Sequence, residues 1–88
     1  MRVTYIKNIN YFDKNNNLVQ CQNVDRQQFD DLQTALQILK NTDLHFVQNK
    51  KGVSVYEELK IIYRKDNFNY ICFNKSIDPI TNEVVCNV

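Results

Sequence analysis

The amino-acid sequence predicts a small α+β domain, in which one amphipathic helix packs across a mostly antiparallel sheet and the elements follow the order ββαββββ. Three observations support this fold class. The chain has 88 residues, which is the size of one domain with a single thin core, so residues 1–88 are expected to form one unit. Several segments alternate apolar with polar residues, and one segment has apolar residues at helical spacing.

The N-terminal segment predicts a β-hairpin. Apolar side chains alternate with polar ones from Val3 to Tyr11, and Lys7 is the exception on the apolar side. Residues Leu18 to Val24 have the composition of a second strand, and Asp13 to Asn17 would form the loop between the two. That loop begins like a calcium-binding loop but lacks its glycine and its closing glutamate, so we predict no metal site there.

The next segment predicts the helix. Asp25 and Gln28 have the spacing of a capping box, and we expect the helix to run from about Arg26 to Asn41. Its apolar stripe consists of Phe29, Leu32, Ala35, Leu36 and Leu39. Ile38 lies at the edge of that stripe, where it would extend the core or mark an interface.

The second half of the chain predicts four further strands. Leu44 to Gln48 is the first, and the only glycine lies in the turn that follows it. Ser54 to Lys65 fits two structures: a helix, because its apolar residues recur at helical spacing, or a strand joined to the next by a two-residue turn at Asp66-Asn67. We favour the strand, and Glu83 to Val88 predicts the last one.

The stretch from Phe68 to Phe73 is the most informative for function. Its spacing resembles the aromatic part of the RNA-recognition-motif signature, in which alternate rings stack on bases. That signature has a basic residue and a glycine where this chain has Asp66-Asn67. A strand with large side chains on both faces is buried on both sides or leaves an apolar patch for a partner, and we favour a core or interface strand.

The composition and the reactive residues argue against catalysis. Eleven Lys and Arg balance ten Asp and Glu, so net charge implies no polyanion partner. The three cysteines (Cys21, Cys72 and Cys86) have no CxxC spacing, and His45 is the only histidine. We therefore predict buried structural thiols, no disulfide, no metal, no cofactor and no enzymatic activity. The absence of an apolar stretch of membrane-spanning length, or of a signal-peptide core, predicts a cytoplasmic protein that does not enter a membrane.

The sequence therefore predicts a small non-enzymatic accessory protein that binds another protein. Frequent asparagine suggests an AT-rich coding sequence, hence a phage- or mobile-element-encoded inhibitor that occludes a host protein, with a homodimer through an edge strand as a further expectation. The interface candidates are Tyr63, Phe68, Tyr70, Phe73 and Ile38. The alternative is a nucleic-acid-binding module that uses Phe68 and Tyr70 with basic turns, whose candidates are Lys50, Lys51, Arg64 and Lys65.

Overall fold

The computed structural model describes residues 2–87, and the side chains of residues 2–45 and 51–87. It confirms the α+β class and the element order ββαββββ. The elements are β1 (Val3–Phe12), β2 (Leu18–Phe29), α1 (Leu32–Asn41), β3 (Phe46–Lys50), β4 (Val53–Arg64), β5 (Tyr70–Ile77) and β6 (Val84–Asn87).

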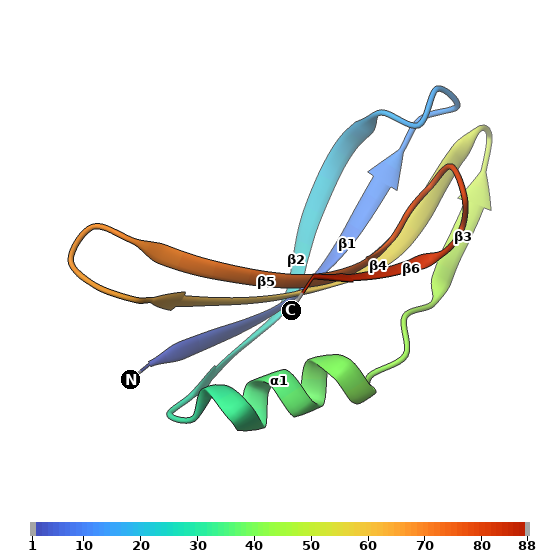
Figure 1. Cartoon of the computed structure of the whole chain (residues 1–88). Helices are drawn as coiled ribbons and strands as arrows, with labels where there is room; N and C mark the ends of the chain where they lie inside the picture. The colour runs from blue at the N-terminus through green and yellow to red at the C-terminus, as the bar shows by residue number, and fades with distance from the viewer. Residues whose placement is uncertain (1, 88) are drawn as a thin grey trace.

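All six strands form one antiparallel sheet in which β4 is the central strand (Figure 1). β1 pairs with one edge of β4, from Val3 opposite Tyr63 to Phe12 opposite Ser54. The other edge of β4 is shared, since β3 pairs with its first part and β5 with its last. The order β2-β1-β4-β5-β6 leaves β2 and β6 at the outer edges of the sheet.

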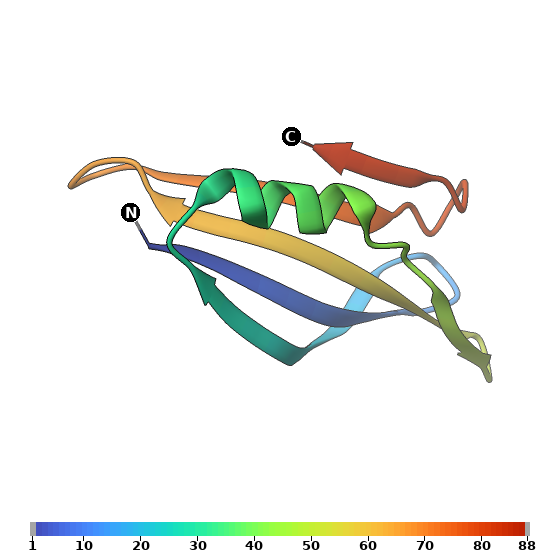
Figure 2. The same cartoon turned by 90° about the horizontal axis from the view of Figure 1, so that it is seen from below.

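The helix covers one face of this sheet (Figure 2). Its buried residues Ala35 and Leu39 pack on side chains of β1 and β4 that point to the same face. The buried cluster consists of Val3, Tyr5, Ala35, Leu39, Leu59 and Ile61. We call the opposite side of the sheet, which α1 does not cover, the helix-free face.

The helix begins later than the sequence predicts. β2 does not end at Val24 but pairs with β1 as far as Phe29, which lies opposite Val3. The ladder hydrogen bonds of this long hairpin override the capping box, and the actual N-cap is Asp31, whose carboxylate accepts hydrogen bonds from the N–H groups of Gln33 and Thr34. Phe29 still joins the core, from the end of a strand.

The segment from Ser54 to Lys65 is a strand, which confirms the favoured alternative. The connection to β5 is nevertheless longer than the predicted two-residue turn, because pairing ends at Arg64 opposite Tyr70. Residues 65–69 form the loop, so Phe68 lies outside the strand. Tyr63 consequently lies opposite Ile71, and not opposite Tyr70 as the shorter turn would require.

Two asparagines occupy turn positions that usually need glycine. Asn16 and Asn82 have φ angles of 64° and 60°, in the left-handed region that asparagine tolerates better than most residues. Lys51 and Gly52 take up the same region between β3 and β4, at 52° and 81°. Among residues 2–87, no helix is long and apolar enough to cross a membrane.

Candidate functional site

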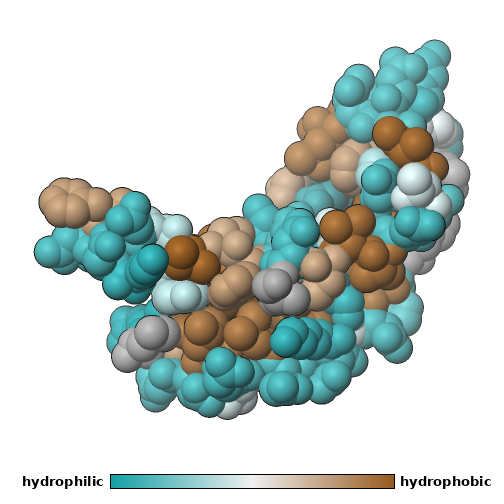
Figure 3. Space-filling model, viewed as in Figure 1, coloured by the Kyte–Doolittle hydropathy of each residue, from teal (hydrophilic) through white to brown (hydrophobic). Residues whose placement is uncertain are grey.

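The helix-free face carries the two hollows with the clearest chemistry. Figure 3 shows that the molecule has two projecting arms with an open depression between them on the side away from α1. One arm is the hairpin β4–β5, and the other contains the ends of the hairpins β1–β2 and β3–β4 (Figure 1). One hollow is rich in arginine and the other in hydrogen-bond acceptors.

The first hollow collects all three arginines of the chain. Arg2, Arg26 and Arg64 line a volume of about 300 Å³, together with Thr4, Ile62, Tyr63 and Tyr70. The register explains this convergence, because Arg26 lies opposite Ile6 on β1 and Arg64 lies opposite Tyr70 on β5. Directly paired residues of an antiparallel sheet point to the same face, so these side chains extend to the helix-free face. We call this region the arginine hollow.

The arginine hollow has positive charge without compensating carboxylates. None of its lining residues is acidic, and no carboxylate among the described side chains forms an ion pair with Arg2, Arg26 or Arg64. Guanidinium groups present up to five N–H donors in a planar fork that suits carboxylate or phosphate. The hollow is therefore suited to an anionic group, with the Tyr70 ring and Ile62 as its apolar part.

Next to the arginine hollow, the tip of the β4–β5 hairpin is held by a local hydrogen-bond network. Arg64 donates from Nε to the carbonyl of Asp66 and from Nη2 to that of Asn67, both at 3.0 Å. Asp66 Oδ1 accepts hydrogen bonds from the N–H groups of Phe68 and Asn69, at 2.8 and 2.9 Å. The loop is thus fixed while Phe68 remains 91% exposed, which reduces the entropy lost if its ring contacts a partner.

The second hollow lies at the other end of the same face. Its lining residues come from β1, the start of β2, β4 and the β5–β6 region and enclose about 290 Å³. Asn10 and Glu58 contribute polar groups, while Phe12, Leu18 and Val85 contribute apolar ones. We call this region the acceptor hollow, because its lining includes the carboxylates of Glu58 and Asp78 and the amide of Asn10, whose Oδ1 accepts no hydrogen bond from the described residues.

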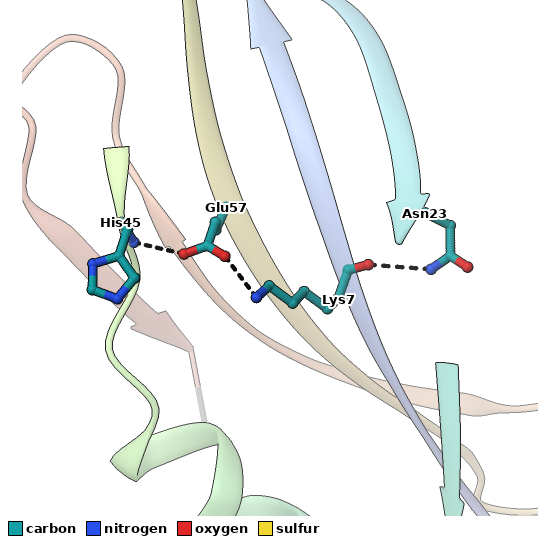
Figure 4. A network of polar contacts seen from close by, with 4 residues as sticks. All are labelled: Lys7, Asn23, His45 and Glu57. Carbon is teal, nitrogen blue, oxygen red and sulfur yellow. Dashed lines mark hydrogen bonds and ion pairs between the residues drawn. The ribbon is translucent and has the colours of Figure 1, made fainter. Parts of the chain in front are cut away.

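A third polar cluster lies on the helix-covered face (Figure 4). Glu57 Oε2 is 2.7 Å from Lys7 Nζ, and Glu57 Oε1 accepts a hydrogen bond from the backbone N–H of His45 at 2.9 Å. This ion pair explains why Lys7 interrupts the apolar positions of β1. On the far side of β1, the amide of Asn23 donates to the carbonyl of Lys7 at 3.3 Å, next to the bulge in β2.

These contacts change the protonation of the pair. Burial opposes ionisation of Glu57 most strongly, but the hydrogen bonds from Lys7 and from the His45 N–H together outweigh it and lower the pKa of Glu57. The hydrogen bond to Glu57 in turn raises the pKa of Lys7. The Glu57 side chain is 11% exposed and is fully committed to these partners, so the cluster is structural.

Only part of the predicted protein interface is on the surface. Phe68 and Tyr70 are 91% and 68% exposed, and Tyr70 lines the arginine hollow. Tyr63 also lines this hollow, but it is half-buried, as is Phe73: their rings stack at a centroid distance of 6.2 Å and pack against the core beneath α1. Ile38 is 36% exposed on α1, away from the other candidates.

The four basic candidates do not form one patch. Lys51 lies in the turn before β4, and Arg64 and Lys65 lie at its far end, so the 12-residue strand β4 runs from one to the other. At about 3.3 Å per residue this is a separation of nearly 40 Å. The side chain of Lys50 lies outside the described residues. Of this set, Arg64 alone lines the arginine hollow.

The cysteines differ from the prediction, since Cys21, Cys72 and Cys86 are all exposed free thiols. Each lies on a strand that α1 leaves partly uncovered, and β2 and β6 are edge strands. The described part of the chain contains no group of three or more residues of the types that bind a metal ion. The His45 side chain is exposed, and its backbone N–H is what contacts Glu57.

Sequence reasoning missed Arg2 and Arg26 altogether. They are far from Arg64 along the chain, and they are neighbours because β1 lies between β2 and β4 in the sheet. The sequence does contain one indication that the arginines share a face: all three occupy even positions, as do Thr4, Ile6 and Ile62 of the same face. Using it would have required the strand order, which the sequence does not specify.

Comparison with models of protein families, with curated proteins and with solved structures found no match for this chain.

Proposed function

We propose that this protein is a non-enzymatic binding protein that uses the arginine hollow and the adjoining β4–β5 tip to hold an acidic site on a partner protein. The observation that carries the proposal is the convergence of Arg2, Arg26 and Arg64 on one hollow beside exposed Tyr70. Arginine and tyrosine are the residues most enriched at energetically important positions of protein interfaces. A carboxylate that enters the hollow would meet donors that have no acidic partner among the described side chains.

The extent of the charge favours a protein partner over a nucleic acid. Proteins that bind single strands combine stacking aromatics with a basic groove that follows the phosphate backbone over several nucleotides. Here the three arginines gather at one end of the face, Lys60 follows on the same face opposite Ile6, and Glu58 and Asp78 line the hollow at the other end. A short site with both charge signs nearby suits a protein surface. The nucleic-acid alternative rests on the same arginines with Phe68 and Tyr70.

The experiment is capture of partners by the tagged protein from the lysate of a low-GC bacterium, with and without nuclease, followed by quantitative mass spectrometry and reconstitution of the purified pair. The diagnostic variant is Arg2→Ala with Arg26→Ala. Arg64 is kept, because its guanidinium also holds the hairpin loop. We expect the double variant to weaken the reconstituted complex about tenfold or more, as loss of charged hydrogen bonds predicts.

A matched control removes the same charge elsewhere. Lys14 and Lys40 are exposed and do not line either hollow, so Lys14→Ala with Lys40→Ala should leave affinity unchanged. If both double variants weaken the complex equally, the loss of net charge alone explains the effect, and the proposed site is contradicted. Binding that disappears with nuclease, and whose affinity falls steeply with salt, would replace the protein partner with a nucleic acid.

The finer expectations remain part of the proposal. Occlusion of a host protein by an inhibitor encoded on a phage or mobile element rests on size and composition, and we propose the cytoplasm as its site of action. A homodimer through an edge strand has β2 as its main candidate, because that strand is exposed over almost all of its length. The bulge at residues 23–25 interrupts its regular pairing and disfavours a long added strand.

A further inference from the structure

The acceptor hollow contains oxygen atoms that the protein leaves without donors. Asn10 is 8% exposed, and its Oδ1 is buried with no hydrogen-bond partner among the described residues. Buried polar atoms in folded proteins are almost always hydrogen-bonded, so an orphaned acceptor costs stability. Asn10 lies opposite Tyr56 in the sheet and lines the hollow on the helix-free face.

Two carboxylates add to this excess of acceptors. Glu58 accepts one hydrogen bond at Oε1, from the Asn8 amide at 3.3 Å, and Asp78 accepts one at Oδ1, from the Ile80 N–H at 2.8 Å. Within the described residues the second oxygen of each has no hydrogen-bond donor and no ion pair. Both residues line the same hollow as Asn10.

The hollow supplies few donors in return. The Tyr56 hydroxyl is directed to Asn82 Oδ1 at 2.9 Å, and no lysine or arginine lines the hollow among the residues whose side chains the structure describes. The remaining walls are apolar, and the rings of Phe12 and Tyr56 pack edge to face with centroids 5.9 Å apart. Aromatic and apolar walls around carboxylates suit an organic cation, because its charge is attracted to ring faces and its alkyl part contacts the apolar side chains.

We infer that the acceptor hollow binds an organic cation with several N–H donors, an alkylammonium or alkylguanidinium group. Such a group brings the donors that Asn10, Glu58 and Asp78 lack and neutralises the two carboxylates. The inference is independent of the arginine hollow. If both hold, the face has an anion site at one end and a cation site at the other, so a partner with a basic and an acidic group could engage it in one orientation only.

The test uses n-butylammonium and n-butylguanidinium as probes and n-butanol as the neutral control of similar shape, with titrations followed by ¹H–¹⁵N NMR. We expect both cations to shift the amide signals of residues that line the hollow and to reach saturation, while butanol binds at least about tenfold more weakly. A blocked lysine peptide identifies the source of the cation. If the peptide binds at least as tightly as butylammonium, the natural ligand is a basic side chain of a partner protein. If the peptide does not bind, the natural ligand is a free amine.

Two variants separate this role from a structural one. Glu58→Gln keeps an oxygen for the Asn8 amide but removes the charge, so it should weaken cation binding about tenfold while the fold is retained. Asn10→Leu removes the orphaned acceptor and keeps the branching of the side chain, so it should abolish binding and raise the Tm of the free protein by about 4 °C. Cation binding no tighter than that of butanol, or unchanged in Glu58→Gln, would overturn the inference. A lowered Tm in Asn10→Leu with binding retained would also overturn it.

Discussion

Lys75 Nζ lies 2.6 Å from the carbonyl oxygen of Thr42, so a buried lysine of β5 closes the C-terminal end of α1. The same ammonium donates to the carbonyl of Lys40 at 3.0 Å. Carbonyls at the end of a helix have no partner within it and carry partial negative charge, which a cation stabilises. Lys75 is 8% exposed, and these contacts account for its burial next to an apolar core.

Replacement of this lysine should therefore destabilise the fold. Lys75→Met keeps most of the unbranched side chain but removes both hydrogen bonds and the charge, and we expect the free energy of unfolding to fall by about 2–3 kcal/mol. Urea denaturation followed by circular dichroism measures this change. Lys65→Met, at an exposed loop position, is the control and should change stability by less than about 0.5 kcal/mol. Similar small effects at both positions would show that the lysine cap contributes little.

The pair of Glu57 and Lys7 predicts how stability depends on pH. The pKa of Glu57 is lowered in the folded state, so its contribution is complete above its unfolded pKa, about 4.3, and is lost as the pH falls through its folded pKa. The pKa of Lys7 is raised, and so, by burial, is that of Tyr5, so their contributions are lost as the pH rises beyond about 10. Stability should be nearly constant between these limits.

Glu57→Gln tests the acid side of this profile. The variant keeps an oxygen for the His45 N–H but loses the ion pair, and we expect a cost of about 1–2 kcal/mol at pH 7 that shrinks towards pH 3. Thermal melts at a series of pH values measure it. Glu83→Gln, at an exposed position, serves as the control. If the difference between Glu57→Gln and the wild type stays constant from pH 7 to pH 3, the lowered pKa is not a source of stability.

The two tyrosines near the β4–β5 hairpin should have separate roles. Tyr63 stacks on Phe73 and packs on the core, so Tyr63→Ala should cost about 2–3 kcal/mol of stability. Tyr70 is exposed beside the arginine hollow, so Tyr70→Ala should leave stability within about 0.5 kcal/mol and weaken the complex with the partner. Denaturation and binding titrations of both variants decide the matter. Unchanged partner affinity in Tyr70→Ala would remove this residue from the interface.

Substitution of two aspartates tests which residue caps the N-terminus of α1. Asp31→Ala removes the side chain that accepts hydrogen bonds from Gln33 and Thr34, so it should lower the urea midpoint and the helical circular dichroism signal. Asp25 belongs to the capping box that the sequence suggests, but it lies opposite Lys7 in the β1–β2 ladder. Asp25→Ala should therefore leave the helical signal intact. The opposite ranking of the two variants would place the N-cap at Asp25.

The sequence predicts the order of elements well because each element has its own local signal. Alternation from Val3 to Tyr11 and the apolar stripe from Leu32 to Leu39 reflect the periodicity of one face, and this periodicity survives in the fold. The start of the helix is not predicted, since pairing of β2 with β1 up to Phe29 outweighs a local capping preference. Cys21 and Cys72 are exposed because they lie opposite Asn10 and Ile62 on the helix-free face, and Cys86 is exposed on the edge strand β6.

The candidate sites are harder to predict for a related reason. The exposed aromatics Phe68 and Tyr70 are visible in the sequence, because neighbouring residues form that tip. The arginine hollow instead joins residues of β1, β2, β4 and β5 with Arg2 just before β1, and the acceptor hollow joins β1, the start of β2, β4 and the β5–β6 region. Both depend on which strands are neighbours, and this follows from packing of the whole sheet.

The central place of β4 also constrains the order in which the protein can fold during synthesis. β1 and β2 form a local hairpin as soon as both have left the ribosome, but β1 pairs along its other edge with β4, whose last residue is Arg64. Until that residue emerges, one edge of β1 and the apolar side of the hairpin stay open to chaperones or to other nascent chains. Contacts this distant in sequence also slow folding, so translation pauses before residue 64 should prolong the vulnerable interval.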